Sequence, residues 1–221
     1  MRSDADVVNV ESVNPVLRAC SPEICMALMA RGDLRQFEPE TILFRTGEPA
    51  GKVLFLLDGR LQIDKTGNRG RRQVICTMTA RDCGGICLLL LGQKGLADVR
   101  ALEHGHLLLV DRAVFQALAK QDERLCDAGW KGAAECMAHL SELVEHLSFH
   151  KVAQRVAATL VDQTQKDGDL IHLTQAELAA EVGTTREVVA RSLAGLQTAG
   201  IIRLGRGRIT VMNRDKLGQM T

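Results

Sequence analysis

The stretch from Leu173 to Arg191 constrains the fold more than any other part of the chain. Thr174 and Glu177 have the spacing of a capping box, in which a threonine hydroxyl and a glutamate carboxylate satisfy backbone N–H groups at the start of a helix. Ala179 is small enough for two helices to cross closely, and Gly183 suits a turn that needs a positive φ. The pattern predicts two short helices joined by a tight turn, which is a helix-turn-helix motif.

The second of these helices carries charged side chains that can recognise DNA bases. Thr185 is predicted to cap it. Arg186 and Glu187 fall in its first turn, and Arg191 lies one turn beyond Glu187 on the same face. Arginine can donate two hydrogen bonds to O6 and N7 of guanine, and glutamate can accept one from N4 of cytosine. The segment therefore predicts a recognition helix that enters the major groove.

A basic hairpin is predicted directly after this helix. Residues 200–211 contain two apolar runs separated by Gly205, Arg206 and Gly207, which is typical of the wing of a winged helix. Residues 182–214 hold six arginines and one glutamate, although the whole chain has a net charge of only +1. Arginines at a wing can contact DNA phosphates, whereas the alternative is an ordinary helical pair with a solvated basic face. The candidate DNA-binding residues are Thr174, Thr185, Arg186, Glu187, Arg191, Arg206 and Arg208.

A heptad pattern precedes the helix-turn-helix. Apolar or small residues recur at alternating spacings of four and three from Cys126 onward, as in the a and d positions of a coiled coil. We expect a helix over about residues 123–147 that pairs with a second copy of itself. The alternative is a long helix that packs on its own domain. The candidate dimer-interface residues are Trp130, Ala133, Met137, Leu140, Val144 and Leu147.

Short strands are predicted before this helix. Apolar or alternating runs of strand length occur between residues 42 and 110, and turn sequences such as Asp58-Gly59 separate them. Such a series is typical of a β-barrel or jelly roll. The predicted fold is therefore α+β. We expect a β-barrel sensor domain over residues 1–121, a dimerisation helix over 122–148 and a winged helix-turn-helix domain over 149–221.

The chain resembles the family of the cyclic-AMP receptor protein and the fumarate–nitrate reduction regulator along nearly its whole length. The most specific matches are residues 184–191 and the run from Thr46-Gly47-Glu48 to Gly59. The resemblance implies an allosteric bacterial transcription factor with a cyclic-nucleotide-binding-like domain. It also implies double-stranded DNA with palindromic TGTGA-like half-sites, a second copy of the chain and RNA polymerase as partners.

The resemblance also locates a phosphate-binding cassette whose functional residues are missing. Cyclic-nucleotide binders of the family begin it with Gly-Glu-Leu and end it with Arg-Ser or Arg-Thr before an alanine. Here the start reads Gly84-Gly85-Ile86, and Gly95-Leu96 precedes Ala97. The arginine neutralises the cyclic phosphate and the glutamate holds the ribose hydroxyl, so their absence argues against cyclic AMP. A cyclic-nucleotide-responsive regulator with an atypical cassette is the alternative.

Cysteine and histidine side chains offer other ways to detect a signal. Cysteine thiols can act in redox chemistry or bind metal, and cysteine or histidine can ligate haem iron. The particular motifs of the family's iron–sulfur and carbon-monoxide sensors are absent, so haem, metal and thiol chemistry stay open and the cofactor is unidentified. The candidate effector residues are Cys76, Cys83, Cys87, Cys126, Cys136, His104, His106 and His139.

Other classes of protein find little support in the sequence. No Walker loop, HExxH or GxSxG motif occurs, so an enzyme built on the barrel is a distant alternative. No apolar run approaches the roughly 18 residues that span a bilayer. The N-terminal residues contain no apolar signal region. We therefore expect a cytoplasmic protein without a membrane partner.

Overall fold

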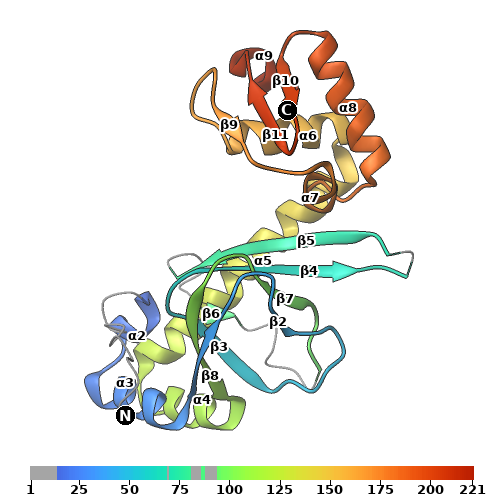
Figure 1. Cartoon of the computed structure of the whole chain (residues 1–221). Helices are drawn as coiled ribbons and strands as arrows, with labels where there is room; N and C mark the ends of the chain where they lie inside the picture. Colours follow the sequence, from blue (N-terminus) through green and yellow to red (C-terminus); the bar gives the residue numbers. More distant parts are fainter. Residues whose placement is uncertain (1–13, 69, 81–85, 88–93) are drawn as a thin grey trace, which may run out of the picture. The chain divides into compact units, whose positions relative to one another are not determined.

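The computed structural model describes residues 14–68, 70–80, 86–87 and 94–221. The chain divides into two compact units (Figure 1). Unit 1 comprises residues 1–64 and 76–140, and unit 2 comprises residues 65–75 and 141–221. The long helix α5 (Glu123–Phe149) contributes to both units.

Among the described residues, two antiparallel sheets of four strands form most of unit 1, and they give it a jelly-roll-like fold. Of the β-barrel and the jelly roll that the sequence suggests, the structure has the jelly-roll-like form, because the described strands lie in two sheets and do not close into one barrel. The sheet that contains β3 has the order β1 (Asp33–Phe37), β8 (Gly105–Asp111), β3 (Lys52–Leu56) and β6 (Ile86–Cys87). The other sheet has the order β2 (Ile42–Phe44), β7 (Asp98–Ala101), β4 (Arg60–Thr66) and β5 (Arg72–Thr79).

Strands β3 and β8 lie at the centre of the unit 1 core. They pair in register from Lys52 with Asp111 to Leu56 with Leu107, and both faces of the pair are buried. This explains why both strands are continuous apolar runs rather than alternating ones. Strand β1 was missed in the sequence because four of its five residues are exposed, which leaves no apolar periodicity to detect.

Three helices pack beside this sheet: α2 (Pro15–Ala19), α3 (Pro22–Arg31) and α4 (Arg112–Ala119). Helix α3 begins where the sequence suggests, with Ser21 at its N-cap and proline in the first turn. Buried Asn14 caps α2 and donates a hydrogen bond from Nδ2 to the carbonyl of Leu56 at 2.9 Å. None of the helices in the described ranges is long and apolar enough to cross a membrane.

Asp122 connects the start of α3 to the start of α5. Its carboxylate accepts the backbone N–H of Ser21 at 2.7 Å and that of Arg124 at 2.9 Å. These bonds, that from Ser21 above all, hold the pKa of Asp122 at about 2, below the usual 3.8. The ionised carboxylate therefore stabilises the junction between the two helices.

Unit 2 is a helical domain with a small sheet. Its helices after α5 are α6 (Val152–Asp162), α7 (Gln175–Glu181), α8 (Arg186–Thr198) and α9 (Arg214–Gly218). The sheet order is β10 (Ile202–Gly205), β11 (Arg208–Val211) and β9 (Leu170–Ile171). Val156 and Leu160 of α6, Leu178 of α7, and Val189 and Leu193 of α8 are fully buried in one core. This core fixes α8 on the domain by its inner face.

Candidate nucleic-acid interface

Helices α7 and α8 form the predicted helix-turn-helix. Thr174 Oγ1 accepts the backbone N–H of Glu177 at 3.2 Å, and Glu177 Oε2 accepts that of Thr174 at 2.7 Å, so the capping box is confirmed. Val182 ends α7, and Gly183 follows with a φ of +67°. The backbone N–H of Thr184 then bonds the carbonyl of Ala179 at 3.0 Å. A left-handed glycine directs the chain from one helix to the next.

The recognition helix α8 presents a charged face to solvent. Arg186, Glu187 and Arg191 are exposed, whereas Val189 is buried in the core. Because the inner face is held by packing, the three charged side chains keep the outer face of the first two turns. The structure therefore places the predicted base-reading residues on one accessible surface.

Thr185 occupies the N-cap position of α8, but its side chain makes no capping hydrogen bond. The sequence prediction of a threonine cap was wrong in this respect. The backbone N–H of Glu187 and the hydroxyl of Thr185 lower the pKa of the Glu187 carboxyl. Glu187 is therefore ionised at neutral pH and can accept hydrogen bonds from a cytosine amino group.

A basic groove of about 530 Å³ lies between α7, α8 and the hairpin β10–β11. Thr174 of α7, Arg186 of α8, and Arg206 and Arg208 of the hairpin line it. Three guanidinium groups at one groove create a local positive potential, although the net charge of the whole chain is only +1. Four predicted DNA-binding residues from three elements thus meet at one place.

Arg214 does not belong to this basic surface, although it contributes to the local charge count. Its Nε donates to the carbonyl of Thr164 at 3.0 Å, and its Nη2 to that of Val161 at 3.5 Å. Its backbone N–H bonds Asp167 Oδ1 at 2.6 Å. Arg214 therefore satisfies carbonyl groups at the end of α6, a structural role.

Sequence patterns gave no signal for Arg155, which lies in the first turn of α6. Its Nε donates to the carbonyl of Val182 at 2.8 Å, and its Nη1 donates to those of His150 at 2.7 Å and His146 at 3.4 Å. The acceptors are backbone atoms from two other parts of the chain. No residue type at those positions is required for them, so no motif reveals the contact.

Helix α5 carries large apolar side chains that no part of the described chain covers. Trp130 is 72% exposed, Met137 71% and Val144 61%. Ala133 and Leu140 are half-buried. Leu147 is 38% exposed, and a Cβ at Gly183 would lie 2.8 Å from its Cδ2, so part of Leu147 packs on the turn of the helix-turn-helix. The predicted seam residues that precede Leu147 in the sequence form an apolar face of the kind that marks an interface.

The structure describes only some of the cysteines that are predicted to sense a signal. Cys83 and the side chain of Cys87 lie outside the described residues; the backbone of Cys87 pairs with Leu54 in β6. Cys76 on β5, and Cys126 and Cys136 on α5, are half-buried and form no disulfide with another described residue. Burial raises the pKa of the Cys136 thiol, which lowers its thiolate fraction at neutral pH. No three His, Cys, Asp or Glu residues in the described ranges are grouped to hold a metal ion.

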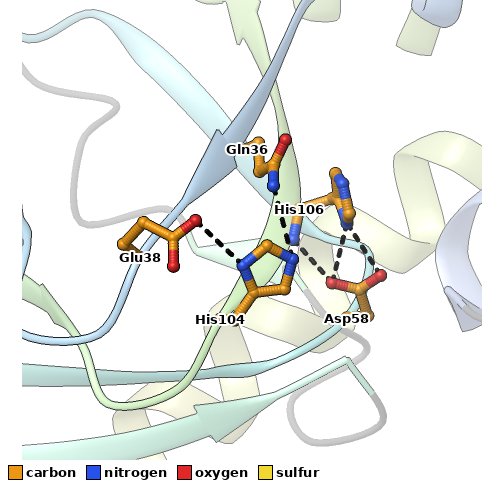
Figure 2. A network of polar contacts seen from close by, with 5 residues as sticks. All are labelled: Gln36, Glu38, Asp58, His104 and His106. Atoms are coloured by element: carbon orange, nitrogen blue, oxygen red, sulfur yellow. Dashed lines mark hydrogen bonds and ion pairs between the residues drawn. The ribbon is translucent and has the colours of Figure 1, made fainter. Parts of the chain in front are cut away.

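Figure 2 shows that His104 and His106 each meet a carboxylate. His104 Nδ1 lies 3.2 Å from Glu38 Oε1, and His106 Nδ1 lies 3.0 Å from Asp58 Oδ2. Asp58 Oδ1 also accepts the backbone N–H of His106 at 2.6 Å. The two rings meet edge to face, with centroids 5.7 Å apart. These contacts tie the Asp58 turn to β8, while the third candidate histidine, His139, is exposed on α5.

Two protein families match the two parts of this architecture. Residues 34–122 match the cyclic nucleotide-binding domain, and residues 154–220 match the Crp-like helix-turn-helix domain. The nitrogen fixation regulation protein FixK of Azorhizobium caulinodans is 30% identical over 199 residues, which cover 85% of this chain and 77% of that protein. The cyclic AMP receptor protein of Thermus thermophilus is 28% identical over 203 residues, covering 90% of this chain and 92% of that protein.

Solved structures agree with the fold. A transcriptional regulator of the Crp/Fnr family from Eubacterium rectale superposes with a TM-score of 0.80 at 19% identity, covering 95% of this chain and 98% of that one. The c-di-GMP-responsive regulator CLP of Xanthomonas campestris gives a TM-score of 0.76 at 20% identity, covering 87% and 99%. The relatives are regulators rather than enzymes. The chain belongs to the Crp/Fnr family of transcription regulators, with a helix-turn-helix DNA-binding domain.

Proposed function

We propose that this regulator binds palindromic DNA as a homodimer and reads TGTGA-like half-sites with Arg186, Glu187 and Arg191. The exposed face of α8 beside the basic groove carries this proposal, because it combines side chains for base edges with arginines for phosphates. Two recognition helices about 34 Å apart would enter successive major grooves on one side of the duplex. Arg206 and Arg208 would hold the backbone.

Homodimerisation through α5 is the second part of the proposal. The exposed side chains of Trp130, Met137 and Val144 fall at positions of one heptad seam. A seam of this kind is buried when two copies of the helix pair. A closed, two-fold symmetric dimer also gives two identical DNA-binding surfaces, which is what a palindromic site requires.

The signal is proposed to act at the N-terminal domain through redox, haem or metal chemistry rather than through cyclic AMP. Gly95 and Leu96 stand where cyclic-nucleotide binders of the family have arginine and a hydroxyl residue, and Leu96 is 57% exposed. An apolar side chain there offers a cyclic phosphate no charge partner. The Thermus thermophilus relative is called a cyclic AMP receptor protein, so an atypical cyclic-nucleotide site remains the alternative. Contact with RNA polymerase would convert DNA binding into regulation.

Fluorescence anisotropy with palindromic and scrambled duplexes tests the DNA-binding proposal. Arg191→Ala should lower affinity for the palindrome by about 1–3 kcal/mol per half-site and reduce the preference for guanine. Arg206→Ala should weaken binding to both duplexes alike and reduce the salt dependence. Equal losses on both duplexes for Arg191→Ala would remove that residue from base readout.

The absorption spectrum and metal content of the purified protein test the signal. A Soret band indicates haem, and a stoichiometric metal without such a band indicates a metal site. The alternative is tested by adding cyclic AMP to the anisotropy assay. An increase in palindrome affinity at micromolar nucleotide would favour the cyclic-nucleotide reading over the proposed one.

A further inference from the structure

Arg155 joins three helices of unit 2 through backbone carbonyl groups. Its Nη1 bonds the carbonyls of His146 and His150 at the end of α5, and its Nε bonds the carbonyl of Val182 at the end of α7. The side chain itself comes from the first turn of α6 and is partly buried. One planar cation thus spans the end of the predicted dimer helix and the residue before the turn that leads to α8.

Two of the three carbonyl groups that Arg155 binds, those of His150 and Val182, follow the last residue of a helix, where the helix itself leaves carbonyls unsatisfied. The carbonyl of His146 also accepts the backbone N–H of His150 at 3.3 Å. The C-terminus of a helix also carries partial negative charge, so a guanidinium is favourable there. Because the guanidinium is rigid and planar, it fixes the separation of the acceptors rather than only neutralising them. Leu147, which packs on Gly183, provides a second contact between α5 and the same turn.

We propose that Arg155 is a positioning residue that holds the helix-turn-helix in a fixed orientation on the end of α5. The inference rests on the proposed homodimeric reading of a palindrome, in which α5 sets the separation of the two recognition helices. A loosened joint would leave each α8 able to bind a half-site. It would degrade the match between the spacing of the two helices and the spacing of the two half-sites.

The chain offers a matched control for a merely structural role. Arg214 also donates its guanidinium to carbonyls at a helix end, those of Thr164 and Val161, but all of its partners lie within the α6–α9 part of the domain. Arg214→Ala should therefore lower thermal stability without altering the joint to α5. Arg155→Lys keeps the positive charge of Arg155 but replaces the planar fork with a single ammonium, which cannot reproduce the same set of bonds.

The test measures anisotropy on a half-site duplex and on palindromes whose half-site spacing changes one base pair at a time. Circular dichroism melts confirm that each full-length variant is folded. We expect Arg155→Lys to lower affinity for the best palindrome by about tenfold or more, to flatten the spacing preference, and to change half-site affinity less than about twofold. Arg214→Ala should retain the wild-type spacing preference.

Three outcomes would overturn the inference. The first is a wild-type spacing preference that Arg155→Lys retains. The second is a loss of half-site affinity that equals the loss on the palindrome, because that pattern belongs to a weakened domain. The third is an Arg214→Ala variant that flattens the preference as much as Arg155→Lys. If the wild-type protein shows no spacing preference at all, the homodimeric palindrome proposal itself fails and the inference falls with it.

Discussion

The two units of this protein differ in how close together their functional residues lie in the sequence. In unit 2, the capping box, the turn glycine and the charged face of α8 all fall within residues 174–191. In unit 1, the candidate sensing residues extend from Cys76 on β5 to His139 on α5, with two histidines near β8 between them. One local motif therefore predicts the DNA-binding site, whereas no local motif predicts the proposed sensing site.

The physical reason is the range of the interactions involved. Helix caps and helix faces arise between residues three or four apart, so sequence spacing specifies them. A sensing site in a jelly-roll-like domain is built from strands that are distant in sequence. In unit 1, His104 and His106 meet the carboxylates of Glu38 and Asp58, which lie 66 and 48 residues earlier in the chain. The type and spacing of residues therefore predict the DNA-binding site of unit 2, but they only suggest candidates for the proposed sensing site of unit 1.

The largest expected effect tests whether DNA binding by unit 2 depends on dimerisation through α5, which would couple the local motif to the rest of the molecule. Leu140→Glu places a charge in the predicted seam, where burying it against its symmetry mate is strongly unfavourable. We expect a monomer by light scattering and a loss of palindrome affinity of about 100-fold or more. Ala138→Glu, at an exposed position outside the seam, is the matched control and should remain dimeric. A dimeric Leu140→Glu protein would contradict the seam.

Core truncations compare the stability of the two units. Leu193 in unit 2 and Leu108 in unit 1 are both fully buried. Changing either to alanine should cost about 2–5 kcal/mol in free energy of unfolding, from lost transfer energy and a residual cavity. Hydrogen exchange followed by mass spectrometry should show faster exchange mainly in the unit that carries the change. Equal acceleration in both units by each variant would show that they unfold as one.

The turn of the helix-turn-helix gives a smaller effect. Gly183 has a φ of +67°, and a Cβ there would lie 2.8 Å from Leu147 Cδ2. Gly183→Ala should therefore destabilise unit 2 by about 1–2 kcal/mol. Gly195, inside α8 with open space where a Cβ would lie, offers the opposite control: Gly195→Ala should stabilise unit 2 by about 0.5–1 kcal/mol. Urea titrations that give both changes the same sign would refute this account.

A pH dependence of stability is also expected in unit 1. The pKa of Asp122 is lowered from 3.8 to about 2 in the folded state, chiefly by the backbone N–H of Ser21. Its stabilising contribution is therefore complete above about pH 4 and disappears as the pH falls toward 2. Asp122→Asn should lower the free energy of unfolding at pH 7, and this difference from the wild type should shrink as the pH falls toward 2. A gap that is constant from pH 7 to 2.5 would exclude the carboxylate as its cause.

Much of the fold follows from patterns within the sequence, and the exceptions have identifiable causes. The strands with buried faces, the long helix and the wing hairpin appear near their predicted positions. Strand β1 was missed because its side chains are exposed. Thr185 has the position of a cap without its hydrogen bond, because its hydroxyl bonds Glu187 instead. Propensity indicates which residue can cap a helix, but local competition decides whether it does.

Local spacing alone determined that this chain has a helix-turn-helix with Arg186, Glu187 and Arg191 on its outer face, and a long helix with an apolar seam. Only the tertiary structure separated the arginines of unit 2 by role. Arg206 and Arg208 line the groove, Arg214 satisfies the end of α6, and Arg155 binds the ends of α5 and α7. The reason is that these arginines face either solvent or backbone carbonyl groups. Every residue type has a backbone carbonyl, so only the fold determines which carbonyl an arginine meets.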